Sequence, residues 1–206
     1  MKKSELQAAL LDVRKAYCLL ADYQQRLIEL LTFIKNQLDA EHYYHDRQYH
    51  YDSRALHNIY TDPNAGIKFL PMIDFHLLWH RTKHIPENKE WQNHIQHNDL
   101  VFDIYIVDSK IKNCGTLEKA NSEMRLYIYQ CIKYKRKNDW FTDVWRKSVY
   151  PEYFGEVLNW KDENGEMEYN IYGESFDLAD LYNEAAVCEA LDAFRKRASE
   201  KLNQEI

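Results

Sequence analysis

The chain has 206 residues, of which 45% are hydrophobic and 29% charged, and its formal net charge is −6. This composition is that of an acidic protein with a sizeable core, and it excludes an intrinsically disordered chain. Five Gly and four Pro are too few for a turn-dense sandwich or barrel, and no apolar run is long enough for a transmembrane helix. The four cysteines form no CxxC pair, so we expect a reduced, cytoplasmic protein without a membrane partner.

The N-terminal segment carries the longest regular pattern in the chain. Ser4 is a candidate N-cap, and no Pro or Gly follows before Pro63. Apolar residues recur with an unbroken 4-3 spacing, which predicts a long helix that forms a coiled coil or joins a helical bundle. The predicted self-association positions are Leu6, Leu10, Val13, Tyr17, Leu20, Leu27, Leu31, Ile34 and Leu38, with Gln24 as the one polar interruption. The same stripe is also compatible with packing inside the chain.

Residues 41–60 are rich in Tyr and His and also lack helix breakers. We expect either one continuous helix or a reversal near Asn36–Glu41 that makes an antiparallel helical hairpin. The turn from Thr61 to Gly66 is the best boundary. The sequence thus predicts a helical arm over residues 1–60, coiled-coil-like or hairpin, and an α+β domain over residues 67–206.

The second part of the chain mixes short helical and strand patterns. The predicted strands are Ile67–Met72, Leu100–Val107, Met124–Tyr134 and a hairpin of Val157–Trp160 with Met167–Tyr172. The predicted helices are Asp74–His84, Asn88–His97 and Phe176–Leu202. The fold class is therefore α+β, with a long heptad-patterned N-terminal helix or helical hairpin attached to a mixed body that ends in a helix.

All nine histidines lie between His42 and His97, and His76, His80 and His84 are four residues apart. On one helix these side chains share a face, and two imidazoles one turn apart can bind a divalent transition metal. The candidate metal ligands are His76, His80 and Asp74. The alternative is a half-buried helix whose polar side is made of imidazole. No other cofactor is predicted.

A metal-dependent phosphodiesterase or nuclease is an alternative function. Asp74 and the later Asp108-Ser109-Lys110 provide carboxylates for Mg²⁺ and a lysine near the attacking water. Asp108 and Ser109 can equally cap a turn.

Residues 127–150 interleave cations with aromatic rings, as single-strand nucleic-acid binders do. The candidate nucleic-acid or partner-binding residues are Lys133, Lys135, Arg136, Lys137, Trp140 and Trp145. Against nucleic acid, the whole chain is acidic, and the cations can instead face the acidic hairpin around Asp162–Glu168.

The chain contains no Gly-rich phosphate loop, no GxSxG and no cysteine in a triad context. We therefore interpret it as a non-enzymatic interaction protein: a subunit, an adaptor or an inhibitor of the immunity type. It would associate through its N-terminal helix as a homodimer or with another protein.

Overall fold

The computed structural model describes residues 2–47, 74–82, 95–107, 121–135 and 139–206. Within these described residues, two helices, α1 (Lys3–Gln37) and α2 (Glu184–Leu202), accompany six strands. The strands are β1 (Glu41–Arg47), β2 (Phe75–Arg81), β3 (Leu100–Val107), β4 (Glu123–Lys133), β5 (Val157–Lys161) and β6 (Glu168–Asp177). The described residues also form a short π-helix, η5 (Trp140–Trp145), and a 3₁₀ turn, η6 (Leu178–Asp180). The predicted α+β class is confirmed.

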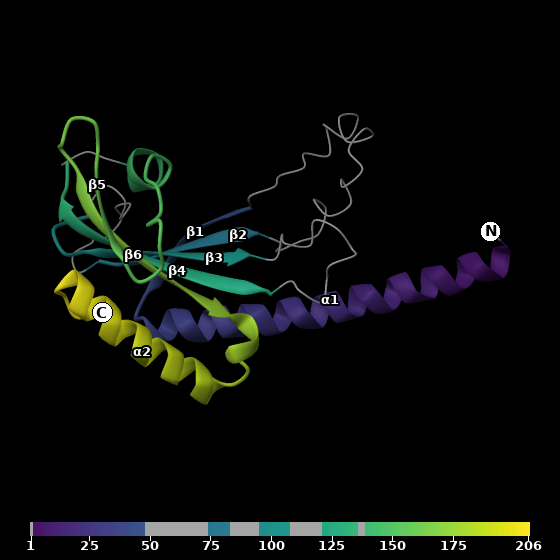
Figure 1. The fold of residues 1–206 in the computed structure, drawn as a ribbon. Coiled ribbons are helices and arrows are strands. Elements are labelled where there is room, and N and C mark those ends of the chain that lie inside the picture. The colour runs from purple at the N-terminus through teal and green to yellow at the C-terminus, as the bar shows by residue number, and fades with distance from the viewer. Residues whose placement is uncertain (1, 48–73, 83–94, 108–120, 136–138) are drawn as a thin grey trace.

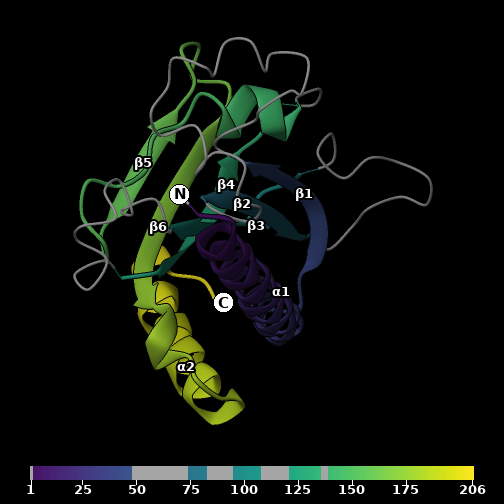
Figure 2. The ribbon, with the colours of Figure 1, turned by 90° about the vertical axis from the view of Figure 1, so that its right-hand side faces the viewer.

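The six strands form one antiparallel sheet in the order β1-β2-β3-β4-β6-β5. Both α-helices lie on the same face of this sheet (Figure 1). The N-terminal half of α1 extends beyond the strands, whereas its C-terminal half lies under them (Figures 1 and 2). The η5 segment packs on the opposite face, where Trp140 and Val144 join a second buried cluster.

Strand β3 reads Leu-Val-Phe-Asp-Ile-Tyr-Ile-Val and is almost continuously apolar because both of its faces are covered. Its even-numbered side chains, such as Phe102 and Ile104, pack toward the helices. Its odd-numbered side chains, such as Val101, point to the second face. Asp103 is the one charged residue in the strand, and it is fully buried on that second face.

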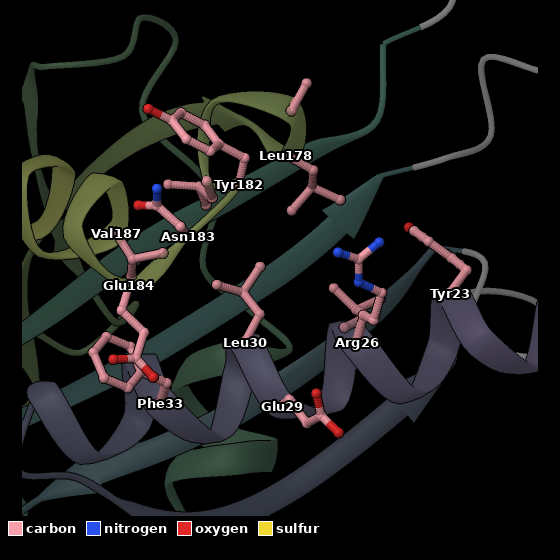
Figure 3. Close-up of a pocket in the computed structure, with 13 residues that line it drawn as sticks. Tyr23, Arg26, Glu29, Leu30, Phe33, Leu178, Tyr182, Asn183, Glu184 and Val187 are labelled. Atoms are coloured by element: carbon pink, nitrogen blue, oxygen red, sulfur yellow. The ribbon is translucent and has the colours of Figure 1, made fainter.

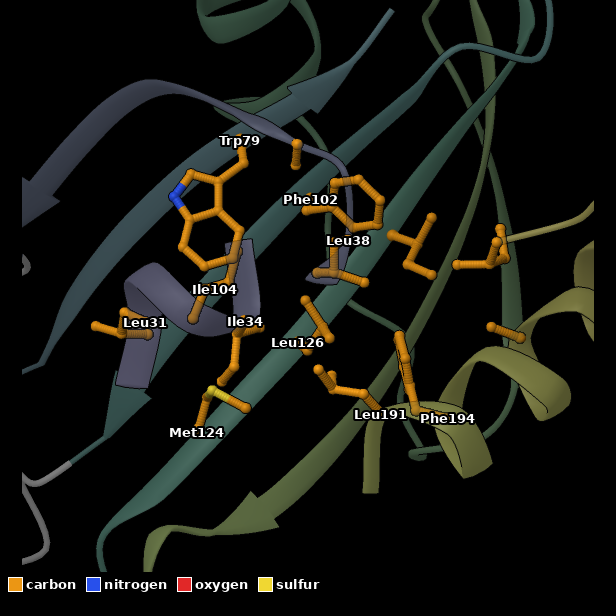
Figure 4. Close-up of a cluster of buried hydrophobic side chains, with 14 of the residues drawn as sticks. Leu31, Ile34, Leu38, Trp79, Phe102, Ile104, Met124, Leu126, Leu191 and Phe194 are labelled. Carbon is orange, nitrogen blue, oxygen red and sulfur yellow. The ribbon is translucent and has the colours of Figure 1, made fainter. Parts of the chain in front are cut away.

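The core between the helices and the sheet contains the C-terminal half of the predicted stripe. Leu31, Ile34 and Leu38 meet side chains of β2, β3 and β4, and Leu191 and Phe194 of α2 close the cluster (Figure 4). Burial of several such side chains, each contributing about 1.5–3 kcal/mol, fixes this half of α1 to the sheet and α2. We call the sheet together with α2 the body.

The hairpin of β5 and β6 is confirmed. Its turn uses Gly165 at φ 63° and is closed by hydrogen bonds to the carbonyl and carboxylate of Asp162. Farther along β6, Gly173 lies under the ring of Tyr127, where an added Cβ would stand 2.2 Å from Tyr127 Cδ1. A side chain at this position would therefore displace Tyr127 from the second face.

The helix predicted over Asp74–His84 is wrong, because Phe75–Arg81 is strand β2. Phe75, Leu77 and Trp79 pack on the helix side, and Leu78 lies in the cluster on the second face. This period of two was present in the sequence. The four-residue spacing of the histidines fits both a helix and a strand, so it does not distinguish them.

The helical continuation predicted after Leu38 is also wrong over residues 41–47, which form strand β1. Helix α1 ends at Gln37, Asp39 adopts a left-handed φ of 49°, and β1 pairs with β2. Residues 41–47 thus belong to the same sheet as the body.

The final helix begins at Glu184, capped by the Asn183 side chain, and not at Phe176, which belongs to β6. The strand predicted over Ile67–Met72 and most of the helix predicted over Asn88–His97 lie outside the described residues. No helix in the described part of the chain is long and apolar enough to cross a membrane.

Candidate functional site

The N-terminal half of α1 presents an apolar stripe to solvent. We call residues 3–22 the arm and its 4-3 positions Leu6, Leu10, Val13, Tyr17 and Leu20 the arm stripe. The exposed fractions of its first four members are 43%, 48%, 44% and 66%. On the same helix, Leu27, Leu31, Ile34 and Leu38 are 3%, 4%, 0% and 0% exposed. One sequence pattern therefore runs from a buried environment into an exposed one.

The other side of the arm carries both polar and apolar residues. Lys15 bonds Asp12 at 3.1 Å, while Leu11 and Leu19 are exposed apolar residues off the stripe. A solvated helical segment of this length is marginally stable unless its apolar side is covered. Contiguous exposed apolar surface commonly marks an interaction site, so the arm stripe is the leading candidate for a binding surface.

A groove of about 440 Å³ lies at the base of the arm, between α1 and the start of α2. Leu30 and Phe33 of α1 line one wall, and Leu178 and Val187 line the other (Figure 3). Arg26 and Glu29 contribute polar groups to the same lining. The groove can accept an apolar group with a polar edge.

The second face of the sheet holds a polar cluster around Asp103. The carboxylate accepts hydrogen bonds from His76 Nδ1 at 2.9 Å, Trp145 Nε1 at 2.7 Å and the Tyr150 hydroxyl at 2.7 Å. The three donors come from β2, from η5 and from the segment after it. Burying a carboxylate is unfavourable unless such donors replace water.

His76 has a fixed orientation within this cluster. Its ring stacks on Tyr105 with 4.0 Å between centroids and 9° between planes, and it meets the edge of Trp145 at 5.3 Å. Donation of the Nδ1 proton to Asp103 leaves Nε2 as the acceptor in the neutral ring. A carboxylate-oriented imidazole of this kind can accept a proton or bind a metal.

The tyrosines around Asp103 keep their protons. Burial, and then the negative charge of Asp103, raise the pKa of Tyr150 far above its ordinary value. The same two causes, burial first, raise the pKa of Tyr129. Although 36% of Tyr150 is exposed, its hydroxyl bonds a fully buried carboxylate, so the phenol acts only as a donor.

The predicted metal ligands His76 and His80 do not share one face of a helix, because this segment is a strand. His76 and His80 lie four residues apart on a strand, which separates them by about 13 Å. Burial lowers the pKa of His80, partly opposed by Glu41, and Asp74 is buried directly before β2 at φ 46°. Among the residues that the structure describes, no three His, Cys, Asp or Glu side chains lie close enough to hold a metal.

The basic aromatic stretch divides between the acidic hairpin and the core. Lys133 donates to the Gly165 carbonyl, and Lys135 pairs with Glu166 at 2.7 Å. Trp140 is buried, and the Trp145 indole bonds Asp103. Arg136 and Lys137 lie outside the described residues, as do His84, Asp108 and Lys110.

Comparison with known proteins gives a family. The model of the PM0109 family matches residues 3–203. The chain belongs to the PM0109 family. It is 54% identical over 208 residues to "Uncharacterized protein PM0109" of Pasteurella multocida (strain Pm70), and the match covers 100% of both chains. No solved structure matches the chain. The relative from Pasteurella multocida is therefore expected to share this fold, and the family description names no activity.

Asp103, Tyr105 and Tyr150 are not among the site residues predicted from the sequence. A signal for Asp103 was available, since it is the only charge in an otherwise apolar strand. Its partners are 27, 42 and 47 residues away along the chain. The strand register brings His76 to Asp103, and the packing of η5 on the sheet brings Trp145.

Proposed function

We propose that the protein is a self-associating interaction protein, a subunit or adaptor that forms homodimers through its N-terminal arm. The observation that carries this proposal is the arm stripe, which continues the pattern of the core but is 43–66% exposed over its first four positions.

The charge pattern of the arm supports a second copy as the partner. Residues 3–22 carry Lys3, Arg14 and Lys15 against Glu5, Asp12 and Asp22, so two arms meet without net repulsion. Ala9 and Ala16 flank the stripe on one side, and small residues there allow the two helices to approach closely.

The alternatives have less support. A metal-dependent phosphodiesterase would use Asp74 with His76 and His80, and the two histidines lie on a strand and not on one face of a helix. Its other candidate pair, Asp108 and Lys110, lies outside the described residues. Nucleic-acid binding rested on a basic stretch in which Lys133 and Lys135 are engaged by the hairpin at Gly165 and Glu166.

A matched pair of variants tests the proposal. Leu10 and Leu11 are adjacent and equally exposed, at 48% and 47%, but only Leu10 lies on the stripe. We expect Leu10→Glu to abolish dimers because it places a charge in an apolar seam. Leu11→Glu should leave dimers intact. Sedimentation equilibrium over a range of concentrations measures both.

Two results would count against the proposal. One is a wild-type protein that is monomeric at every concentration. The other is equal dissociation by both variants, which would mean that added charge matters and the stripe does not. Thermal unfolding of each variant shows whether the body remains folded.

A further inference from the structure

We infer that the two arms pair antiparallel, with Leu6 of one copy level with Tyr17 of the other and Leu10 level with Val13. This inference rests on the proposed self-association and adds its geometry. It follows from where the body sits relative to the stripe.

The arm stripe and the sheet lie on the same side of α1. The 4-3 spacing from Leu6 to Leu38 is unbroken, and its last four apolar positions are buried against the sheet. A second helix that packs on the arm stripe therefore lies on the side of α1 that faces the sheet. It lies along the part of α1 that extends beyond the strands (Figure 1).

A parallel pair is sterically unfavourable for this reason. In a parallel pair, the second helix would run toward Leu27, where the sheet already covers the apolar side of α1. Both bodies would then have to fit between helices that are about 8–10 Å apart in the arms. An antiparallel pair avoids the conflict, because each body stands beyond the tip of the partner's arm.

The heptad positions fix the register. Leu10 and Tyr17 are a positions and Leu6 and Val13 are d positions, and in an antiparallel pair a residues pack opposite d residues. One register places Leu6 opposite Tyr17 and Leu10 opposite Val13, and it sets Lys3 level with Leu20. The overlap then spans nearly the whole arm, about 27 Å at ~1.5 Å per residue.

The neighbouring registers are worse. A shift of one heptad toward the body sets Leu6 against Gln24 and brings Lys3 level with Leu27, which is 3% exposed beneath the sheet. The opposite shift leaves Tyr17 without a partner. Within the described part of the chain, only the central register buries the four positions from Leu6 to Tyr17 without a collision.

Disulfide trapping in the full-length chain tests the orientation. The background carries Cys18→Ser, Cys114→Ser and Cys188→Ser. Cys131 is retained, because it is fully buried and burial raises the pKa of its thiol to about 12. Leu6→Cys and Tyr17→Cys are made in separate chains, oxidised alone, and then oxidised after mixing under reducing conditions.

In the antiparallel pair, the two copies of position 6 are about 16 Å apart along the axis at ~1.5 Å per residue, too far for a disulfide. We expect neither variant alone to form covalent dimers. The mixture should form dimers that join position 6 of one copy to position 17 of the other, identified by peptide mass spectrometry. Leu11→Cys mixed with Tyr17→Cys is the off-stripe control and should stay uncrosslinked.

The other outcomes separate the two proposals. Covalent dimers of Leu6→Cys alone would establish a parallel pair and overturn the orientation while leaving self-association in place. Sedimentation of the reduced samples is run in parallel. Non-covalent dimers that no cysteine pair traps would place the contact off the stripe and overturn the inference. Monomers in every sample would overturn the proposed function itself.

Discussion

The two halves of α1 have the same sequence pattern and opposite environments. Between Leu27 and Leu38 the apolar side is sealed by the sheet and α2, whereas between Leu6 and Tyr17 it faces solvent. The 4-3 spacing indicates that one side of the helix is covered, but it does not indicate what covers it. The apolar side of the C-terminal half is covered by the rest of the chain. We propose that the apolar side of the N-terminal half is covered by a second copy.

The largest expected effect separates the two halves by stability. Ile34 is fully buried, so Ile34→Ala should lower the free energy of unfolding by about 2–5 kcal/mol through lost burial and a cavity. Leu10→Ala should leave the unfolding of the body nearly unchanged and weaken association instead. Urea unfolding, followed by tryptophan fluorescence, measures the first effect. A large loss of body stability in Leu10→Ala would contradict the division of the helix.

A second contrast of buried and exposed groups lies on the other face of the sheet. Tyr150 donates to Asp103, while Tyr153 is 60% exposed. Tyr150→Phe removes one donor from a buried carboxylate and should cost about 1–3 kcal/mol. Tyr153→Phe should change stability little. Equal effects in urea unfolding would show that Asp103 does not depend on this donor.

The contact of Tyr150 with Asp103 also predicts that folding stability falls at alkaline pH. The pKa of Tyr150 is raised in the folded state by burial and by Asp103. The contribution of Tyr150 to folding stability is therefore complete below pH 10.0, the ordinary pKa of tyrosine. It is lost as the pH rises above that value, because Tyr150 ionises first in the unfolded chain. Stability should fall above that pH, less steeply in Tyr150→Phe. An unchanged slope in that variant would rule out Tyr150 as a source.

The smallest expected effect is the acid response of His80. Burial lowers its pKa below 6.5, so the unfolded chain binds the proton more readily. Stability from this group is present above 6.5 and declines as the pH falls below it. His80→Gln should reduce this decline relative to the wild-type protein. Urea midpoints on either side of that pH give the comparison.

Prediction from sequence succeeded where a local period was unambiguous. The long helix, strand Leu100–Val107 and the hairpin around Gly165 each carry their own signal. It failed over Asp74–His84, because residues spaced by four share a face in a helix and in a strand alike.

The polar cluster could not be predicted for a different reason. His76, Asp103 and Trp145 come from separate elements, and their meeting depends on sheet register and on the position of η5. The arm stripe, in contrast, was visible in the sequence. What the structure adds is the point along α1 at which burial by the chain ends.

Hydrogen exchange of the wild-type protein tests the central claim most directly. An unpaired helical arm is marginally stable and exchanges quickly. We expect amides between Leu6 and Leu20 to be protected at high concentration and to lose that protection on dilution, while amides between Leu27 and Leu38 stay protected throughout. Arm amides that exchange quickly at every concentration, or stay protected independently of concentration, would contradict pairing between copies.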